Sequence, residues 1–268
     1  MKSGAIQDAL PEGAVARGRW RAQKPQEVKE TFARLHEVHP DAHCELVHEG
    51  PFQLLVATVL SAQTTDVAVN RATPALFERF PTPEALAVAR PQDVERIVGS
   101  LGFFRQKARS IISLAEALVR EHAGQVPRTL EELVKLKGVG RKTANVVLGV
   151  AFGAPEGVVV DTHVQRISQR LGWTKRTEPE KIERDLCKIL PQEDWDLTGH
   201  LLIFHGRRIC FALKPRCAEC GVNRLCPSAF RAENVGRKAG RKAVVKSSKA
   251  AKKRVKRAKK APPRPRRR

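Results

Sequence analysis

The sequence predicts an all-α fold built from many short helices. Apolar residues recur at helical spacing through most of the chain between about residues 25 and 210. Proline, glycine and threonine divide this stretch into short segments, because they favour helix starts, helix ends and turns. The only strand-like segment is 158–160, and it is too short to found a sheet.

The first helix is expected to begin near Pro25, since the following residues form one apolar face made of Val28, Phe32, Leu35 and Val38. Further helices are expected at 51–60, 66–80, from 82, from 91, and at 106–122, 129–136, 141–152, 161–171, 178–190 and 194–210. Thr82 and Thr129 are the expected N-caps of their helices. Glu132 stands at the capping-box position after Thr129.

The charge is strongly positive and unevenly spread. The chain has 50 Lys and Arg against 28 Asp and Glu, a formal net charge of +22. Such an excess favours a polyanionic partner, nucleic acid first and an anionic membrane surface second. No run of about 18 apolar residues is present, so no membrane span is expected. The first residues do not resemble a secretory signal, so a cytoplasmic, nucleoid-associated protein is expected.

Both ends of the chain are expected to lie outside the folded part. Residues 1–25 show no sustained period and are interpreted as a flexible arm. Residues 231–268 hold 18 Lys and Arg and one acid, with few large apolar residues, so this tail is predicted to be disordered. The tail is either a solvating segment or an arm that adds nonspecific, salt-sensitive DNA affinity. We favour the arm, because its charge exceeds what solubility requires.

Four cysteines near the end of the helical region form the pattern C-x6-C-x2-C-x5-C: Cys210, Cys217, Cys220 and Cys226. Four thiolates this close in sequence favour one inorganic centre over disulfides in a reducing compartment. Zinc and a [4Fe–4S] cluster both accept four cysteines, and the spacing alone does not separate them. Lys214 and Arg216 lie in the first loop, where they are expected to meet DNA phosphates. Cys44 and Cys187 are expected to be core thiols.

A glycine-containing turn joins two predicted helices at 136–144 (LKGVGRKTA). Gly138 and Gly140 allow a close backbone approach, and the turn leads into a helix N-terminus, whose N–H groups bind anions. Val139 is the expected buried residue and Arg141 an additional cation. The pattern predicts a helix-hairpin-helix that grips DNA phosphate; the alternative is a tight turn between helices without ligand.

Two residues near this turn are candidates for catalysis. Lys142 stands in the first turn of the next helix, where the helix dipole disfavours an ammonium and so favours a neutral amine able to form a Schiff base. A phosphate-binding role is the alternative. Asp161 is placed either as a helix N-cap or as a carboxylate that assists such a nucleophile. His163 follows it as a polar contact whose role stays open.

In this order, four motifs closely resemble the endonuclease III family: 60–66 (LSAQTTD), 136–144 (LKGVGRKTA), 160–164 (VDTHV) and the cysteine set. That family consists of iron–sulfur, helix-hairpin-helix DNA glycosylases with abasic-site lyase activity. The resemblance covers about residues 26–230. It implies two α-helical lobes, one at 44–154 with the helix-hairpin-helix at about 130–152, and one combining 26–43 with 155–230. DNA is expected to lie across the mouth of the cleft between them.

The resemblance also implies roles for single residues. Lys142 matches the nucleophile that attacks C1′ of a flipped nucleotide, and Asp161 matches the catalytic aspartate. The four cysteines match the ligands of a [4Fe–4S] cluster, which decides against zinc by analogy. Gln63 matches the residue that fills the gap left by the flipped nucleotide. Phe103 stands where the family usually has an intercalating leucine.

The function implied is base excision repair of double-stranded DNA: a monomer removes oxidised pyrimidines such as thymine glycol and cleaves 3′ to the abasic site by β-elimination. One alternative is a monofunctional glycosylase of the mismatch adenine type, which lacks the lysine. Another is a non-catalytic DNA-binding module that would not cleave the strand. The segment between Lys142 and Asp161 is one residue longer than is usual in the family, near 154–157, which alters the rim of the pocket.

Overall fold

The computed structural model describes residues 21–235, and within them every regular element is helical. The α-helices are α1 (Pro25–Val38), α2 (Gly50–Leu60), α3 (Asp66–Arg79), α4 (Pro83–Ala87), α5 (Pro91–Ile97), α6 (Phe104–His122), α7 (Leu130–Leu133), α8 (Arg141–Phe152), α9 (Thr162–Arg170), α10 (Pro179–Ile189) and α11 (Trp195–Arg208). Three 3₁₀ turns are η1 (Gln192–Asp194), η2 (Cys217–Glu219) and η3 (Ala232–Asn234). The predicted all-α class is confirmed, and 158–160 forms no strand.

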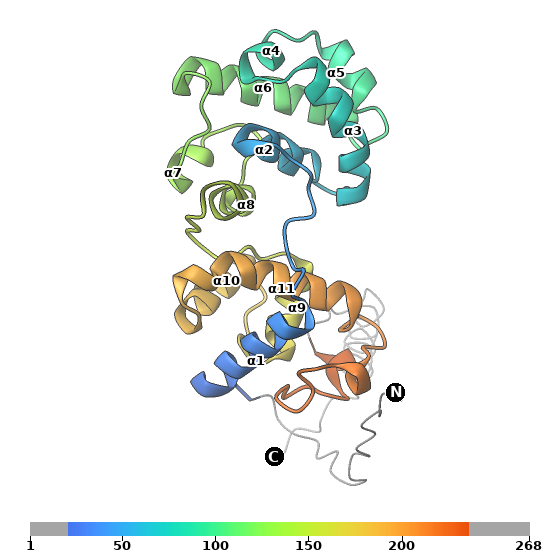
Figure 1. The fold of residues 1–268 in the computed structure, drawn as a ribbon, viewed down its shortest axis with the longest axis vertical. Helices are drawn as coiled ribbons and strands as arrows, with labels where there is room; N and C mark the ends of the chain where they lie inside the picture. The colour runs from blue at the N-terminus through green and yellow to red at the C-terminus, as the bar shows by residue number, and fades with distance from the viewer. Residues whose placement is uncertain (1–20, 236–268) are drawn as a thin grey trace, which may run out of the picture.

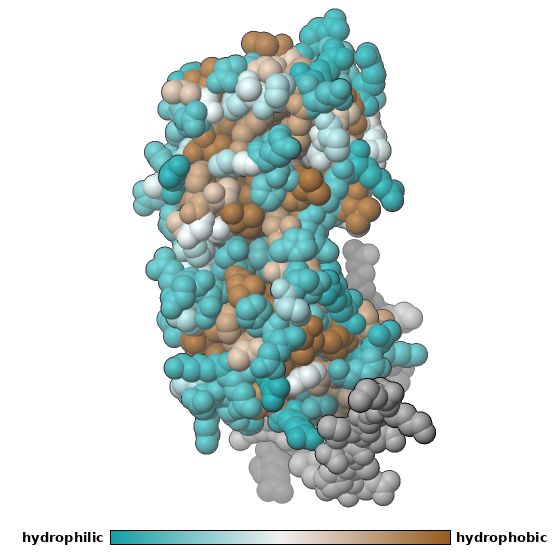
Figure 2. Space-filling view, viewed as in Figure 1, coloured by the Kyte–Doolittle hydropathy of each residue, from teal (hydrophilic) through white to brown (hydrophobic). Residues whose placement is uncertain are grey.

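The helices form two lobes with separate hydrophobic cores (Figure 1). The first lobe contains α2–α8, and its core lies around the buried faces of α2 and α6. The second contains α1 and α9–α11, and its core includes Val28, Leu35 and Leu201. The lobes are joined by the segments 39–49 and 153–161 and meet at a waist (Figure 2). This two-lobed arrangement places the start of α8, the start of α9 and one face of α11 around a common space.

Local sequence signals explain several helix ends. The Thr82 hydroxyl accepts a hydrogen bond from Ala85 N, and the Thr129 hydroxyl accepts one from Glu132 N, so both predicted N-caps are confirmed. Glu132 differs from the expected capping box, because its carboxylate accepts a hydrogen bond from the Thr129 hydroxyl (2.7 Å). The helix at 129–136 is shorter than expected, since α7 covers one turn before the chain enters the hairpin. No helix within 21–235 is long and apolar enough to cross a membrane.

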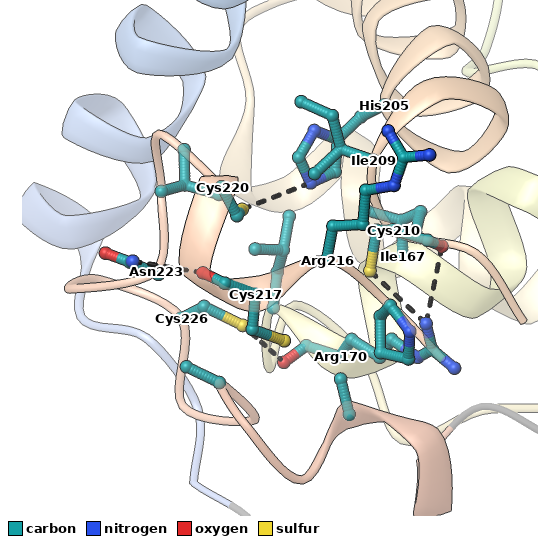
Figure 3. A pocket seen from close by; sticks show the side chains of 15 residues that line it. Ile167, Arg170, His205, Ile209, Cys210, Arg216, Cys217, Cys220, Asn223 and Cys226 are labelled. Atoms are coloured by element: carbon teal, nitrogen blue, oxygen red, sulfur yellow. Dashed lines mark hydrogen bonds between the residues drawn. The ribbon is translucent and has the colours of Figure 1, made fainter. Parts of the chain in front are cut away.

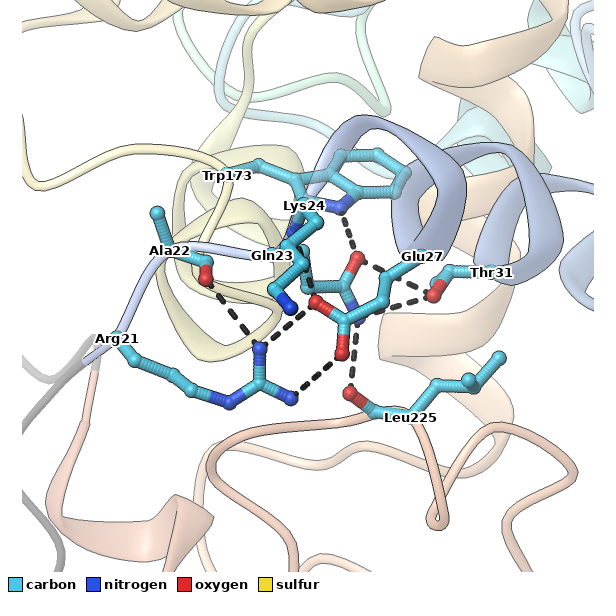
Figure 4. A network of polar contacts seen from close by, with 8 residues as sticks. All are labelled: Arg21, Ala22, Gln23, Lys24, Glu27, Thr31, Trp173 and Leu225. Atoms are coloured by element: carbon cyan, nitrogen blue, oxygen red, sulfur yellow. Dashed lines mark hydrogen bonds and ion pairs between the residues drawn. The ribbon is translucent and has the colours of Figure 1, made fainter.

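The folded part extends beyond the boundaries expected at both ends. The expected arm 1–25 is wrong for 21–24, because Gln23 is buried and bonds to Trp173 Nε1 (2.7 Å) and Leu225 O (2.9 Å) (Figure 4). The expected disorder from 231 is wrong for 231–235, where η3 forms and Val235 O accepts a hydrogen bond from Arg170 Nε (3.0 Å). Buried polar partners fix both segments, which composition does not reveal. The predictions for 1–20 and 236–268 lie outside the described residues.

Candidate active site and cysteine-lined cavity

The turn between α7 and α8 has the conformation expected of a hairpin. Gly138 adopts φ +84°, a left-handed value that favours glycine, while Gly140 is the N-cap of α8. Val139 is 5% exposed, so its predicted burial is confirmed. A side chain at Gly138 would lie within 3.6–3.9 Å of Val59 and Ser110, so the turn rests on α2 and α6. Both glycines are exposed, which leaves the backbone of the turn open to a ligand.

Arg141 is engaged by the other lobe. Its guanidinium donates to both carboxylate oxygens of Glu183 on α10, with Nε–Oε2 and Nη2–Oε1 distances of 2.9 Å. Glu183 is 6% exposed and also accepts a hydrogen bond from Asn145 Nδ2 (3.0 Å). The pKa of Arg141 is raised by this hydrogen-bonded ion pair. The residue expected to contact phosphate therefore fixes the hairpin to the second lobe.

Lys142 and Asp161 line the same cavity between the lobes, about 680 Å³ in volume. We call it the interlobe cavity. Lys142 comes from the first turn of α8 and Asp161 from the start of α9, so each lobe supplies one of the two residues. Lys142 is exposed to solvent. The unbound protein therefore does not bury this amine, and a bound DNA would have to exclude the water around it.

Asp161 caps α9 with a single oxygen. Its Oδ1 accepts hydrogen bonds from the backbone N–H groups of His163 (2.7 Å) and Val164 (2.8 Å), so the predicted N-cap is confirmed. Neither bond uses Oδ2. His163 Nδ1 lies 3.2 Å from Arg166 Nη2, and burial lowers the pKa of His163. Its Nδ1 accepts a hydrogen bond from this guanidinium, and His163 lines the open depression beside the cavity together with Asp66 and Arg207.

Other polar residues of the interlobe cavity carried no role in the sequence analysis. Asp66, at the end of the LSAQTTD motif, lies 3.0 Å from Arg207 Nη2, and Arg207 also pairs with Glu45. Burial raises the pKa of Asp66, while Lys142 acts in the opposite direction. One face of α11 lines the cavity through Asp196, His200, Ile203 and Arg207. Their spacing of i, i+4, i+7 and i+11 is the signal that would have identified this face.

Gln63 and Phe103 lie on two exposed turns of the first lobe. Gln63 follows α2 with φ +53°, and Phe103 is the N-cap of α6 with φ +59°. Phe103 is 66% exposed, and a large aromatic side chain is seldom so exposed in a folded protein. Both backbones occupy the left-handed region that costs a non-glycine residue about 1–2 kcal/mol. The structure therefore holds both predicted DNA-contacting residues outward on strained turns.

The four cysteines of the motif line one cavity of about 360 Å³ in the second lobe (Figure 3). We call it the cysteine cavity. Arg170 forms part of its wall and is 1% exposed, with Nη1 3.2 Å from Cys210 Sγ. Its other recorded partners are carbonyl oxygens, and within 21–235 it makes no ion pair with a carboxylate. A buried cation is stabilised by hydrogen-bond acceptors, and the Cys210 sulfur is the acceptor that Arg170 shares with the cavity.

The remaining sulfurs of the cysteine cavity also have polar neighbours. His205, which is buried, places Nε2 3.6 Å from Cys220 Sγ and Nδ1 3.1 Å from His39 Nε2. Burial raises the pKa of Cys220 to about 11 and that of Cys226 to about 12. Within residues 21–235, no three Cys, His, Asp or Glu side chains are arranged to hold a single metal ion.

The loop after Cys210 presents its two cations outward. Lys214 is exposed with φ +50°, and Arg216 is exposed, stacked over the ring of Phe211 at 5.4 Å. Arg216 also lies 3.7 Å from Glu219, a distance at which a solvated ion pair contributes little. Both cations are therefore accessible to an anionic ligand from solvent.

Comparisons with known proteins agree with this geometry. Residues 56–192 match the family model described as HhH-GPD superfamily base excision DNA repair protein. Endonuclease III of Synechocystis sp. is 52% identical over 78% of this chain and 95% of that protein. Endonuclease III of Bacillus subtilis is 45% identical over 76% of this chain and 93% of that protein.

Solved structures of endonuclease III with DNA are also similar to this chain. A trapped covalent intermediate of endonuclease III with DNA superposes with a TM-score of 0.73 at 44% identity, covering 79% of this chain and 98% of that chain. A non-covalent endonuclease III–DNA complex also gives 0.73, at 43% identity over 79% of this chain and 97% of that chain. A thermostable thymine-DNA glycosylase, 20% identical with a TM-score of 0.69, shares the fold.

Proposed function

The chain belongs to the endonuclease III family of helix-hairpin-helix base excision repair proteins, and we propose that its interlobe cavity is the active site of a DNA glycosylase and abasic-site lyase. The observation that carries this proposal is the meeting of Lys142 and Asp161 in one cavity, one from each lobe. A relative trapped in a covalent intermediate with DNA supports a covalent reaction path here.

In the proposed mechanism the Lys142 amine attacks C1′ of a nucleotide that has left the stack, and the glycosidic bond breaks with its electron pair going to the leaving base. The nitrogen then loses its protons as the sugar ring opens, which leaves a Schiff base at C1′. Removal of a C2′ proton allows the electrons to expel the 3′ phosphate by β-elimination. Hydrolysis of the imine returns Lys142 to the amine.

Asp161 stabilises the positive charge that develops at C1′. The carboxylate is held by two backbone N–H groups on Oδ1, so its position is fixed before DNA binds. Oδ2 is left for the cavity. Asp66 and Arg207 provide further charges beside Lys142 in the interlobe cavity.

Trapping with borohydride tests the nucleophile. Reduction of the Schiff base converts it to a stable bond, so the wild-type protein should form a covalent adduct with a duplex containing an abasic site. Lys142→Ala should form none, whereas Lys29→Ala, an exposed lysine on α1, should match wild type. An adduct of unchanged yield from Lys142→Ala would exclude this residue as the nucleophile.

We also propose that the cysteine cavity holds a [4Fe–4S] cluster through Cys210, Cys217, Cys220 and Cys226. A tetrahedral zinc ion requires four sulfurs about 2.3 Å from one point, whereas a cluster takes one thiolate on each iron and suits more widely spaced sulfurs. The cysteine spacing, which resembles that of the endonuclease III family, favours the cluster, and buried Arg170 beside Cys210 would offset its negative charge. When bound, the cluster supplies a cross-link that orders the loop bearing Lys214 and Arg216.

Several finer expectations complete the proposal. The substrate is double-stranded DNA carrying an oxidised pyrimidine such as thymine glycol, bound by a monomer in the cytoplasm with the chromosome. The hairpin backbone and His163 approach the lesion strand, and the basic residues after 235 add nonspecific affinity. If an abasic site was cleaved but thymine glycol was not removed, the lyase activity would be supported and another damaged base would have to be the substrate. If neither reaction formed a trapped adduct, the mismatch adenine type of glycosylase would become the better interpretation.

A further inference from the structure

Lys107 connects the two strained turns of the first lobe. It lies on α6 one turn after Phe103, and its backbone N–H donates to Phe103 O at 3.0 Å. Its Nζ donates a hydrogen bond to Thr64 Oγ1, beside Gln63. No other hydrogen bond between side chains of these elements joins the Phe103 turn to the 61–65 turn within the described residues.

Stability alone does not account for a lysine at this place. The residue is 6% exposed, and within 21–235 it makes no ion pair with a carboxylate. Burial lowers the pKa of its amine, which measures the cost of removing the charge from water. A methionine of similar length would fill the same space without that cost, so the hydrogen bond to Thr64 requires another explanation.

The 61–65 turn borders the side of the protein on which the interlobe cavity opens. Thr64 and Asp66 line an open depression together with His163 and Arg207. Asp66 and Arg207 also line the interlobe cavity with Lys142. On the same helix as Lys107, Ser110 lies against Gly138 of the hairpin. Helix α6 therefore carries the Phe103 turn and supports the hairpin, while Lys107 connects it to the 61–65 turn.

We propose that Lys107 is a positioning residue that holds the Gln63 and Phe103 turns at a fixed separation, so that both enter the duplex together when a nucleotide leaves the stack. The inference rests on the proposed glycosylase and lyase function. Replacement of a flipped nucleotide requires side chains that reach the helix from both strands at once, and any relative movement of the two turns weakens that contact. The strain at both turns is consistent with side chains held in place before binding.

The test compares duplex with single-stranded DNA, because a nucleotide in a single strand needs no eviction from a paired stack. Lys107→Met should lower single-turnover cleavage of an abasic site in duplex DNA by about 10–100-fold, the usual consequence of slight misplacement. Cleavage of the same site in a single strand should stay within about threefold. The fluorescence rise of 2-aminopurine next to the lesion, which reports unstacking, should be lost in parallel with duplex cleavage.

Two further variants separate positioning from folding. Thr64→Val removes the hydrogen-bond acceptor and leaves the lysine. It should therefore also lower duplex cleavage relative to single-strand cleavage, but by a smaller factor than Lys107→Met. Lys107→Arg keeps a donor and should recover most of the duplex activity, while Lys29→Met should behave as wild type. Equal losses on both substrates, or unchanged duplex cleavage in Lys107→Met, would overturn the inference. A wild-type protein that cleaves neither substrate would refute the proposed function itself, and this inference with it.

Discussion

We propose two roles for the Asp161 carboxylate, as the N-cap of α9 and as a charge at the active site, and the structure shows how to separate them. Both capping hydrogen bonds go to Oδ1, and Asn is as good an N-cap as Asp, so Asp161→Asn can accept from His163 N and Val164 N through its amide oxygen. The amide removes the negative charge without removing the cap. Asp161→Ala removes both.

The expected magnitudes follow from this geometry. Asp161→Asn should change the free energy of unfolding by less than about 0.5 kcal/mol, whereas Asp161→Ala should lower it by about 1 kcal/mol. Loss of a preorganised charge at a developing cation should slow glycosidic cleavage by about 10²–10³-fold in both variants. The two variants should thus match in activity and differ in stability.

Single-turnover removal of thymine glycol from a duplex measures the first quantity, and thermal unfolding measures the second. The rate of cleavage at a preformed abasic site should fall less in both variants, because no glycosidic bond has to break there. Our reasoning about Asp161 would be falsified if Asp161→Asn retained glycosylase activity within threefold of wild type. A large loss of stability in Asp161→Asn would show that the charge, and not the cap, supports α9.

Other predictions concern the second lobe and the basic tail. Gln23→Met should lower the free energy of unfolding by about 3 kcal/mol, or the Tm by about 6–12 °C, because it leaves Trp173 Nε1 and a buried carbonyl without partners. Arg170→Leu should reduce the iron bound per purified chain, since losing one partner of a buried charge pair costs about 3–5 kcal/mol. The pKa of His163 is lowered by burial, so as pH falls below about 6.5 the unfolded chain takes up a proton that the folded chain does not. The free energy of unfolding should therefore decrease as the pH falls through that window, with a shallower slope in His163→Gln. Deletion of 236–268, which holds 17 Lys and Arg and no acid, should flatten the salt dependence of DNA binding and leave abasic-site cleavage intact at low salt.

Each of these has a control and a contrary result. Lys24→Ala, an exposed neighbour of Gln23, should leave Tm within about 2 °C, since surface substitutions change stability little. Arg224→Leu, on the cysteine loop but exposed, should keep its iron, and equal iron loss would remove the special role of Arg170. An unchanged pH slope in His163→Gln would assign the titration to another group. An unchanged salt slope after the deletion would place nonspecific binding on the lobes.

The sequence by itself determined the features that depend on neighbouring residues. Helical spacing gave the all-α class, and side-chain hydroxyls placed the caps at Thr82 and Thr129, because these interactions span only a few residues. The hairpin and the cysteine spacing are local for the same reason. The sequence also identified Lys142 and Asp161 as candidates, although their approach to one another was known only through the family resemblance.

Only the tertiary structure decided which distant residues meet. Asp66 and Arg207 are 141 positions apart, and Gln23 and Leu225 are 202 apart, yet each pair is in hydrogen-bond contact. Arg141, which reads as a phosphate ligand in its motif, is held by Glu183 of the other lobe. A side chain with a fixed charge takes the partner that packing brings to it, and the free energy of that pairing depends on burial, which the local pattern does not contain.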